Sequence, residues 1–72
     1  MVDRKKLKET LKAKKISTET AAAYMGLAPS TLYRKLRPNG IKFTVRDVES
    51  LCELLKLSKK AREEIFFADK QA

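Results

Sequence analysis

Apolar residues recur along this chain at the three- and four-residue spacing of α-helices, in short runs separated by polar breaks. Leu7 and Leu11 form one such run, and Leu32 and Leu36 form another. A strand would require strict alternation of apolar and polar residues, and only residues 41–43 alternate, too briefly for a sheet. The pattern therefore predicts an all-α fold, a compact bundle of short helices.

Capping residues divide the chain into five predicted helices. Asp3 is expected to cap a first helix that runs to about residue 14, and Ser17 a second helix that runs to Met25. Gly26 suits the left-handed end of that second helix, and Pro29 suits the first position of the third. A breaker cluster at residues 37–40 ends the third helix. Thr44 with Asp47 predicts a capping box for the fourth, and residues 57–58 begin the fifth.

The last two helices differ in the width of their apolar faces. In the fourth, the apolar residues share a stripe of about 120°, which is a normal core face; they are Val45, Val48, Leu51, Cys52 and Leu55. In the fifth, Ile65, Phe66 and Phe67 span about 200° at 100° per residue. We expect this wider patch to contribute to a two-fold dimer, unless the terminal residues fold back over it.

Composition limits the possible functions. The 72 residues suffice for a single domain over 1–72, with a modest core. The chain has no His and one Cys, which excludes an internal disulfide and a Cys/His metal site; Cys52 is expected to be an inert core thiol. No nucleophile stands beside a base and no Gly-rich phosphate loop is present, so we expect no enzyme, no cofactor and no small-molecule ligand. No signal peptide or membrane span is apparent, which predicts a cytoplasmic protein.

The charge distribution indicates a polyanionic partner. The net charge is +8, and no acidic residue occurs between Glu19 and Asp47 although five basic residues fall there. Nucleic acid, an anionic membrane surface and an acidic protein would each suit this balance, while a charge run can also be no more than a solvated surface. Within the third helix, Leu32 and Leu36 share one face, and Ser30, Arg34 and Arg37 fall on the opposite one. Tyr33 lies at the flank of that polar, basic face.

Residues 17–37, STETAAAYMGLAPSTLYRKLR, resemble the helix-turn-helix of the phage Cro and repressor (Cro/CI, XRE-type) family. The resemblance includes small Ala22, Gly26 in the turn between apolar Met25 and Leu27, and Leu32 as the anchor of the recognition helix. Two positions depart from the pattern. Lys35 replaces an expected apolar residue, with Leu36 taking that place, and Pro29 stands where relatives often carry a polar side chain that reads a base.

The resemblance implies a sequence-specific regulator of transcription, a phage-type repressor that binds a palindromic double-stranded DNA operator as a homodimer. Its implied base-contacting residues are Thr18, Pro29, Ser30, Tyr33 and Arg34. Its implied phosphate-contacting residues are Ser17, Lys35, Arg37, Lys42, Thr44 and Arg46, and its implied dimer residues are Ile65, Phe66 and Phe67. A one-domain chain fits a Cro-like role better than that of an autocleaving repressor.

Two alternatives belong to other functional classes. A small helical protein-interaction module, such as an antirepressor or antitoxin-like adaptor, could use the same bundle and its C-terminal Phe patch. A membrane-surface role for the basic first helix is weaker, because Leu7 and Leu11 give a narrow apolar face without a bulky aromatic residue. Arg34 could also be a plain surface charge, and Thr18 could serve only to cap its helix.

Overall fold

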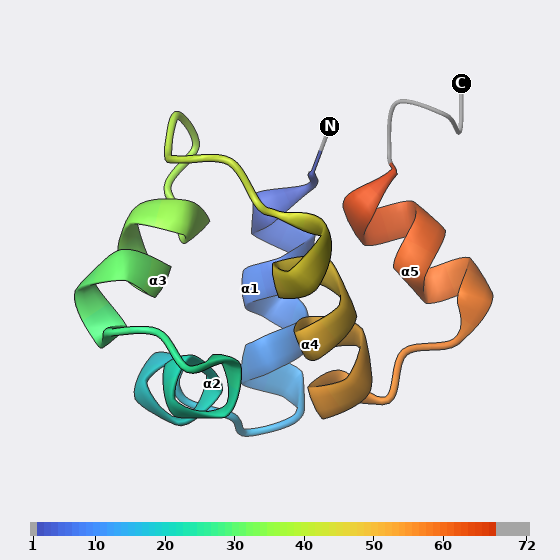
Figure 1. The fold of residues 1–72 in the computed structure, drawn as a ribbon. Helices are drawn as coiled ribbons and strands as arrows, with labels where there is room; N and C mark the ends of the chain where they lie inside the picture. The colour runs from blue at the N-terminus through green and yellow to red at the C-terminus, as the bar shows by residue number, and fades with distance from the viewer. Residues whose placement is uncertain (1, 68–72) are drawn as a thin grey trace.

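The computed structural model describes residues 2–67, which form five α-helices and contain no strand (Figure 1). In chain order the helices are α1 (Arg4–Ala13), α2 (Thr18–Met25), α3 (Pro29–Leu36), α4 (Val45–Leu55) and α5 (Lys59–Phe66). The predicted all-α class is confirmed, and the first residue of each helix lies within about a residue of the expected one.

Local side-chain caps explain where α1, α2, α4 and α5 begin. Asp3 accepts a hydrogen bond from the backbone N–H of Lys6, and the hydroxyl groups of Ser17 and Ser58 accept equivalent bonds at α2 and α5. At α4, Thr44 and Asp47 each accept from the other's backbone N–H, which is the predicted capping box. Such caps typically stabilise a helix by about 1 kcal/mol each, so they are strong local signals.

The connection between α2 and α3 is short because α2 ends abruptly. Gly26 adopts a left-handed conformation, with φ of 72°, and its N–H reaches back to the carbonyl groups of Ala22 and Ala23. Residues 27 and 28 then lead directly to Pro29, the first residue of α3, where a missing N–H costs nothing. Both predicted terminal signals are confirmed.

The core forms where α2 packs against α3 and α4, and where α1 packs against α3 and α5. Its buried apolar residues come from all five helices: Leu7, Leu11, Ala21, Ala22, Met25, Leu32, Leu36, Leu51, Leu55, Ile65 and Phe66. In this arrangement α3 and α5 lie on opposite sides of the molecule (Figure 1). A ligand on the outer face of α3 would therefore not meet α5.

The predicted dimer patch on α5 is wrong for two of its three residues. Ile65 is 1% exposed and Phe66 is 4% exposed, so both belong to the core of the protomer. The Ile65 carbonyl accepts a 2.6 Å hydrogen bond from the Asp3 N–H, and the Phe66 ring meets Phe43 edge to face at 6.1 Å. The start of α1 and the residues before α4 therefore cover the C-terminal turn of α5, and Phe67 is half-buried.

Val45 does not belong to the core face of α4, contrary to the prediction. It is 75% exposed, because it occupies the first position of the helix, where the chain has not yet reached the packed interior. Leu51 and Leu55, further along the same stripe, are completely buried as expected.

Gly40 permits a close approach of two backbone segments after α3. A Cβ atom at this position would overlap the backbone carbonyl of Arg34 and lie 3.1 Å from the carbonyl oxygen of Arg37. The Gly40 N–H also donates a 3.0 Å hydrogen bond to that Arg37 carbonyl. The chain can therefore turn back tightly over the end of α3 only because residue 40 has no side chain.

Candidate nucleic-acid interface

The solvent-facing side of α3 carries the polar and basic residues that the sequence singled out. Leu32 and Leu36, at 0% and 5% exposure, anchor the helix to the core. Ser30, Arg34 and Arg37 point away from them and are exposed. Pro29 and Tyr33 are exposed as well, Tyr33 at the flank of this face and Pro29 at the first position of the helix.

The two guanidinium groups of this face are not neutralised within the fold. Neither Arg34 nor Arg37 has a side-chain hydrogen bond or an ion pair with another residue of the described range 2–67. No acidic residue occurs on α3. Both cations are therefore available to an external anion or acceptor, and Arg34 lies near the middle of the face.

Glu19 is a residue of this region that the sequence did not identify. Its carboxylate accepts a 3.0 Å hydrogen bond from the Tyr33 hydroxyl, and both side chains are exposed. The contact places one negative charge at the edge of the basic face and occupies the only hydroxyl donor of Tyr33. Helical spacing could not reveal this pair, because the two residues come from different helices and are 14 positions apart.

The start of α2 supplies hydroxyl groups at the same edge. Ser17 is exposed, and its hydroxyl accepts from the Thr20 N–H at 3.1 Å while donating to the Thr20 hydroxyl at 2.9 Å. Thr18 is half-buried. The Ser17 hydroxyl is therefore used to cap α2. Neither Ser17 nor Thr18 carries a charge.

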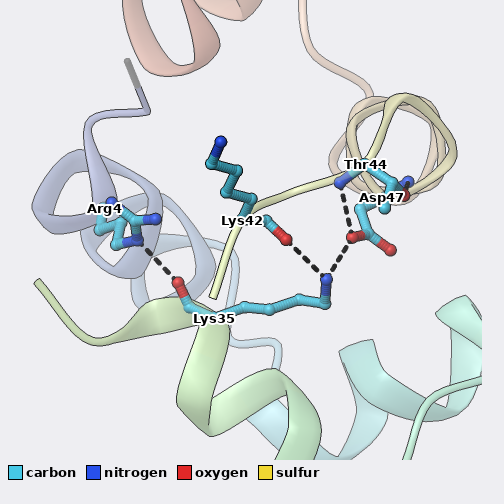
Figure 2. Close-up of polar contacts among 5 residues, drawn as sticks. All are labelled: Arg4, Lys35, Lys42, Thr44 and Asp47. Carbon is cyan, nitrogen blue, oxygen red and sulfur yellow. Dashed lines mark hydrogen bonds and ion pairs between the residues drawn. The ribbon is translucent and has the colours of Figure 1, made fainter. Parts of the chain in front are cut away.

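The prediction that Lys35 contacts a phosphate is wrong. Lys35 is 6% exposed, and its ammonium group forms a 2.6 Å ion pair with Asp47, which is 7% exposed (Figure 2). The same ammonium donates a 2.9 Å hydrogen bond to the Lys42 carbonyl. Lys35 lies only about 60° from Leu32 around the helix, so its stem enters the core and its charge is used internally. It is not available to a phosphate.

Asp47 joins this ion pair to the start of α4. Its carboxylate also accepts a 2.9 Å hydrogen bond from the Thr44 N–H. Burial alone would raise the pKa of Asp47, but the hydrogen bonds from Lys35 and Thr44 together outweigh burial and leave the pKa of the carboxyl lowered. The carboxylate therefore stays ionised and paired at neutral pH.

Arg4 holds the C-terminal end of α3 from the opposite side (Figure 2). Its Nε donates a 2.8 Å hydrogen bond to the Lys35 carbonyl, and its guanidinium carbon lies 5.7 Å from the centre of the Phe43 ring. The Lys35 ammonium lies 5.8 Å from the same ring. These contacts connect α3 to α1 and to the segment before α4, and they fix the orientation of the exposed face.

Residues 41–46 form a second basic surface next to α3. Lys42, Thr44 and Arg46 are exposed. The backbone carbonyl of Lys42 faces the buried ammonium of Lys35, whereas the Lys42 side chain points away from this network (Figure 2). The structure therefore separates two predicted phosphate contacts: Lys35 is internal and Lys42 is accessible.

Other kinds of site find little support in the described residues. Within residues 2–67, no three His, Cys, Asp or Glu side chains gather in a way that could hold a metal ion. Cys52 is half-buried, and burial raises the pKa of its thiol, with a smaller opposing effect from Arg62, so the thiol is protonated at neutral pH. No helix in this range has the length and apolar character needed to cross a membrane.

Comparison with known proteins gives no relative for this chain. No protein-family model, no curated protein and no solved structure matches it.

Proposed function

We propose that this protein is a sequence-specific DNA-binding regulator of transcription that inserts α3 into the major groove of double-stranded DNA. One observation carries the proposal: α3, which contains no acidic residue, presents Ser30 and Arg34 on an exposed face, with Arg37 directly after the helix, while its other side is anchored in the core. A helix of this kind, preceded by a second helix and a tight turn, is the arrangement that helix-turn-helix proteins use.

Arg34 has the chemistry for direct reading of a base. A guanidinium can donate two parallel hydrogen bonds to O6 and N7 of guanine, which discriminates against other bases by about 1 to 3 kcal/mol. Ser30 and Tyr33 flank Arg34 and can contact a neighbouring base edge, a thymine methyl group or a phosphate. The buried Lys35–Asp47 pair supports this role indirectly, because it limits rotation of α3 against the rest of the fold.

Phosphate contacts would come from the exposed cations beside α3. Arg37, Lys42 and Arg46 are accessible, and Thr44 adds a hydroxyl. Each phosphate neutralised contributes about 0.9 to the steepness with which log affinity falls against log salt concentration. For a dimer that neutralises about 6 to 10 phosphates, the slope would be about −5 to −9.

The resemblance to Cro-type repressors extends the proposal to a dimer on a palindromic operator, where occupancy would exclude RNA polymerase from an overlapping promoter. The dimer contact would need surfaces other than Ile65 and Phe66, since both are buried. Burial of these two residues also removes most of the apolar patch on which the alternative of a protein-interaction module depended.

The test is selection from random duplex DNA at matched, near-physiological salt, with the wild type, Arg34→Ala and the control Arg62→Ala. Arg62 is an exposed arginine on α5, so the control removes the same charge on the side opposite α3. We expect the wild type and the control to enrich the same two-fold symmetric site, and Arg34→Ala to lose preference at one base pair of each half-site. Weak binding without sequence preference in all three proteins would contradict the proposal.

A further inference from the structure

A groove of about 560 Å³ lies beside the exposed face of α3, between α1, the start of α2 and the end of α3. Its apolar lining comes from Leu11, Ile16 and Leu36. Its cationic lining comes from Lys8, Lys12 and Arg37. The groove therefore combines an apolar floor with a basic rim, and two of its three cations belong to α1.

Within residues 2–67, the two α1 lysines that line the groove have no competing partner. Lys8 and Lys12 lie one helical turn apart, are both exposed and form no ion pair with any residue of the described part of the chain. No acidic side chain lines the groove, although Glu19 contacts one of its lining residues, Tyr33. The two charges are free to bind an external anion.

The position of the groove around α3 suggests which anion. Tyr33 lines the groove, whereas Lys35 contacts the 42–47 segment; the arc from Tyr33 through Arg34 to Lys35 covers about 200° of the helix circumference. One flank of the exposed face of α3 is therefore the groove with Lys8 and Lys12 of α1. The other flank is the segment 42–46, whose basic residues are Lys42 and Arg46. The major groove of B-DNA, about 12 Å wide, is likewise bordered by a sugar–phosphate backbone on each side.

We propose that this groove binds one of the two sugar–phosphate backbones that border the major groove, with Lys8 and Lys12 contacting phosphate oxygens. The apolar floor suits the deoxyribose carbons, and the ammonium groups suit the phosphates as point charges. The inference depends on the proposed function and extends it, because it makes α1 part of the DNA-binding surface. Lys42 and Arg46 would contact the opposite backbone.

The test compares two double variants of equal charge change. Lys8→Gln with Lys12→Gln removes the rim, and Lys59→Gln with Lys60→Gln removes two exposed lysines from α5, on the far side of the fold from α3 (Figure 1). Affinity for the enriched duplex is measured by fluorescence anisotropy between about 50 and 200 mM salt, because the affinity of proteins for DNA falls steeply over this range. Circular dichroism melting checks that both variants fold like the wild type.

The α1 variant is expected to flatten the salt slope by about 2 per bound protomer, at about 0.9 for each lost contact, without changing the preferred sequence. The α5 variant should leave the slope nearly unchanged. Equal slopes for the two variants would overturn the inference while leaving the proposed function intact, since they would mean that only net charge matters. A wild type without sequence preference would overturn the proposed function and this inference with it.

Discussion

Replacing Lys35 with Met tests whether the buried ion pair holds α3 in place. The substitution keeps the length and apolar stem of the side chain but removes its charge. The Asp47 carboxylate would then remain 7% exposed, and the Thr44 N–H would be its remaining hydrogen-bond donor among the contacts described above. The Lys42 carbonyl would lose the ammonium group that donates to it. A buried carboxylate without its cation is the main source of the expected loss.

Breaking a buried ion pair by removing one partner typically costs about 3 to 5 kcal/mol. The retained hydrogen bond from Thr44 places Lys35→Met at the lower end, at about 3 kcal/mol. A domain of 72 residues has a free energy of unfolding of about 4 to 11 kcal/mol, so between about a quarter and three quarters of the stability would be lost. At roughly 4 °C or more per kcal/mol, the melting temperature should fall by about 12 °C or more.

The loss should depend on pH in a defined direction. The pKa of Asp47 is lowered in the fold, so in the wild type the ion pair contributes fully above the ordinary carboxyl pKa of about 3.9. That contribution disappears as pH falls through the lower folded value. In Lys35→Met the uncompensated carboxylate should instead have a raised pKa and become neutral more readily. The difference in stability between the two proteins should therefore be largest near pH 7 and shrink toward pH 4.

Urea unfolding followed by far-UV circular dichroism measures both effects. Lys42→Met is the matched control, because its ammonium group is exposed, and it should change the free energy of unfolding by less than about 0.5 kcal/mol. The double variant Lys35→Met with Asp47→Asn should recover a large part of the loss, since no buried charge remains. If Lys35→Met lowers the free energy of unfolding no more than Lys42→Met, the buried ion pair does not hold α3 in place, and Lys35 is again a candidate for phosphate contact.

Two further substitutions test the surroundings of α3. Gly40→Ala should lower the free energy of unfolding by about 1 to 3 kcal/mol in a melting experiment, because its Cβ would overlap the Arg34 carbonyl; a loss equal to that of the exposed neighbour Asn39→Ala would disprove this. Glu19→Gln should strengthen DNA binding about two- to six-fold, since it removes a negative charge at an assumed distance of roughly 4 to 8 Å from a phosphate. A gain no larger than that of Glu49→Gln, an exposed acid on α4, would place Glu19 outside the interface.

Helix boundaries could be predicted because their signals are local. Ser17 and Thr44 accept hydrogen bonds from residues three positions away, and Gly26 ends α2 through its own backbone conformation. Pro29 starts α3 for a reason contained in its own ring. Each of these signals acts within one helical turn and needs no knowledge of the tertiary fold.

Burial at the helix ends could not be predicted in the same way. Lys35 occupies a position where the family pattern predicts an apolar residue, but its partner Asp47 lies on another helix, and the spacing within either helix does not indicate the pair. Together, Ile65, Phe66 and Phe67 span about 200°, too wide an arc for one neighbour, yet the start of α1 and Phe43 together cover the first two of them. In both cases, contacts between distant segments decided the outcome.

If the exposed face of α3 reads DNA, the backbone amides on that side of the protein should respond to a bound duplex, and an NMR titration measures this response. Isotope-labelled protein is mixed with the duplex enriched in the selection, and changes in backbone amide shifts are mapped on the fold. Large changes are expected at residues 29–37, with further changes at residues 17–19 and 41–46, and little change on α5. Changes concentrated on α5, or none at any DNA concentration, would show that α3 does not read DNA.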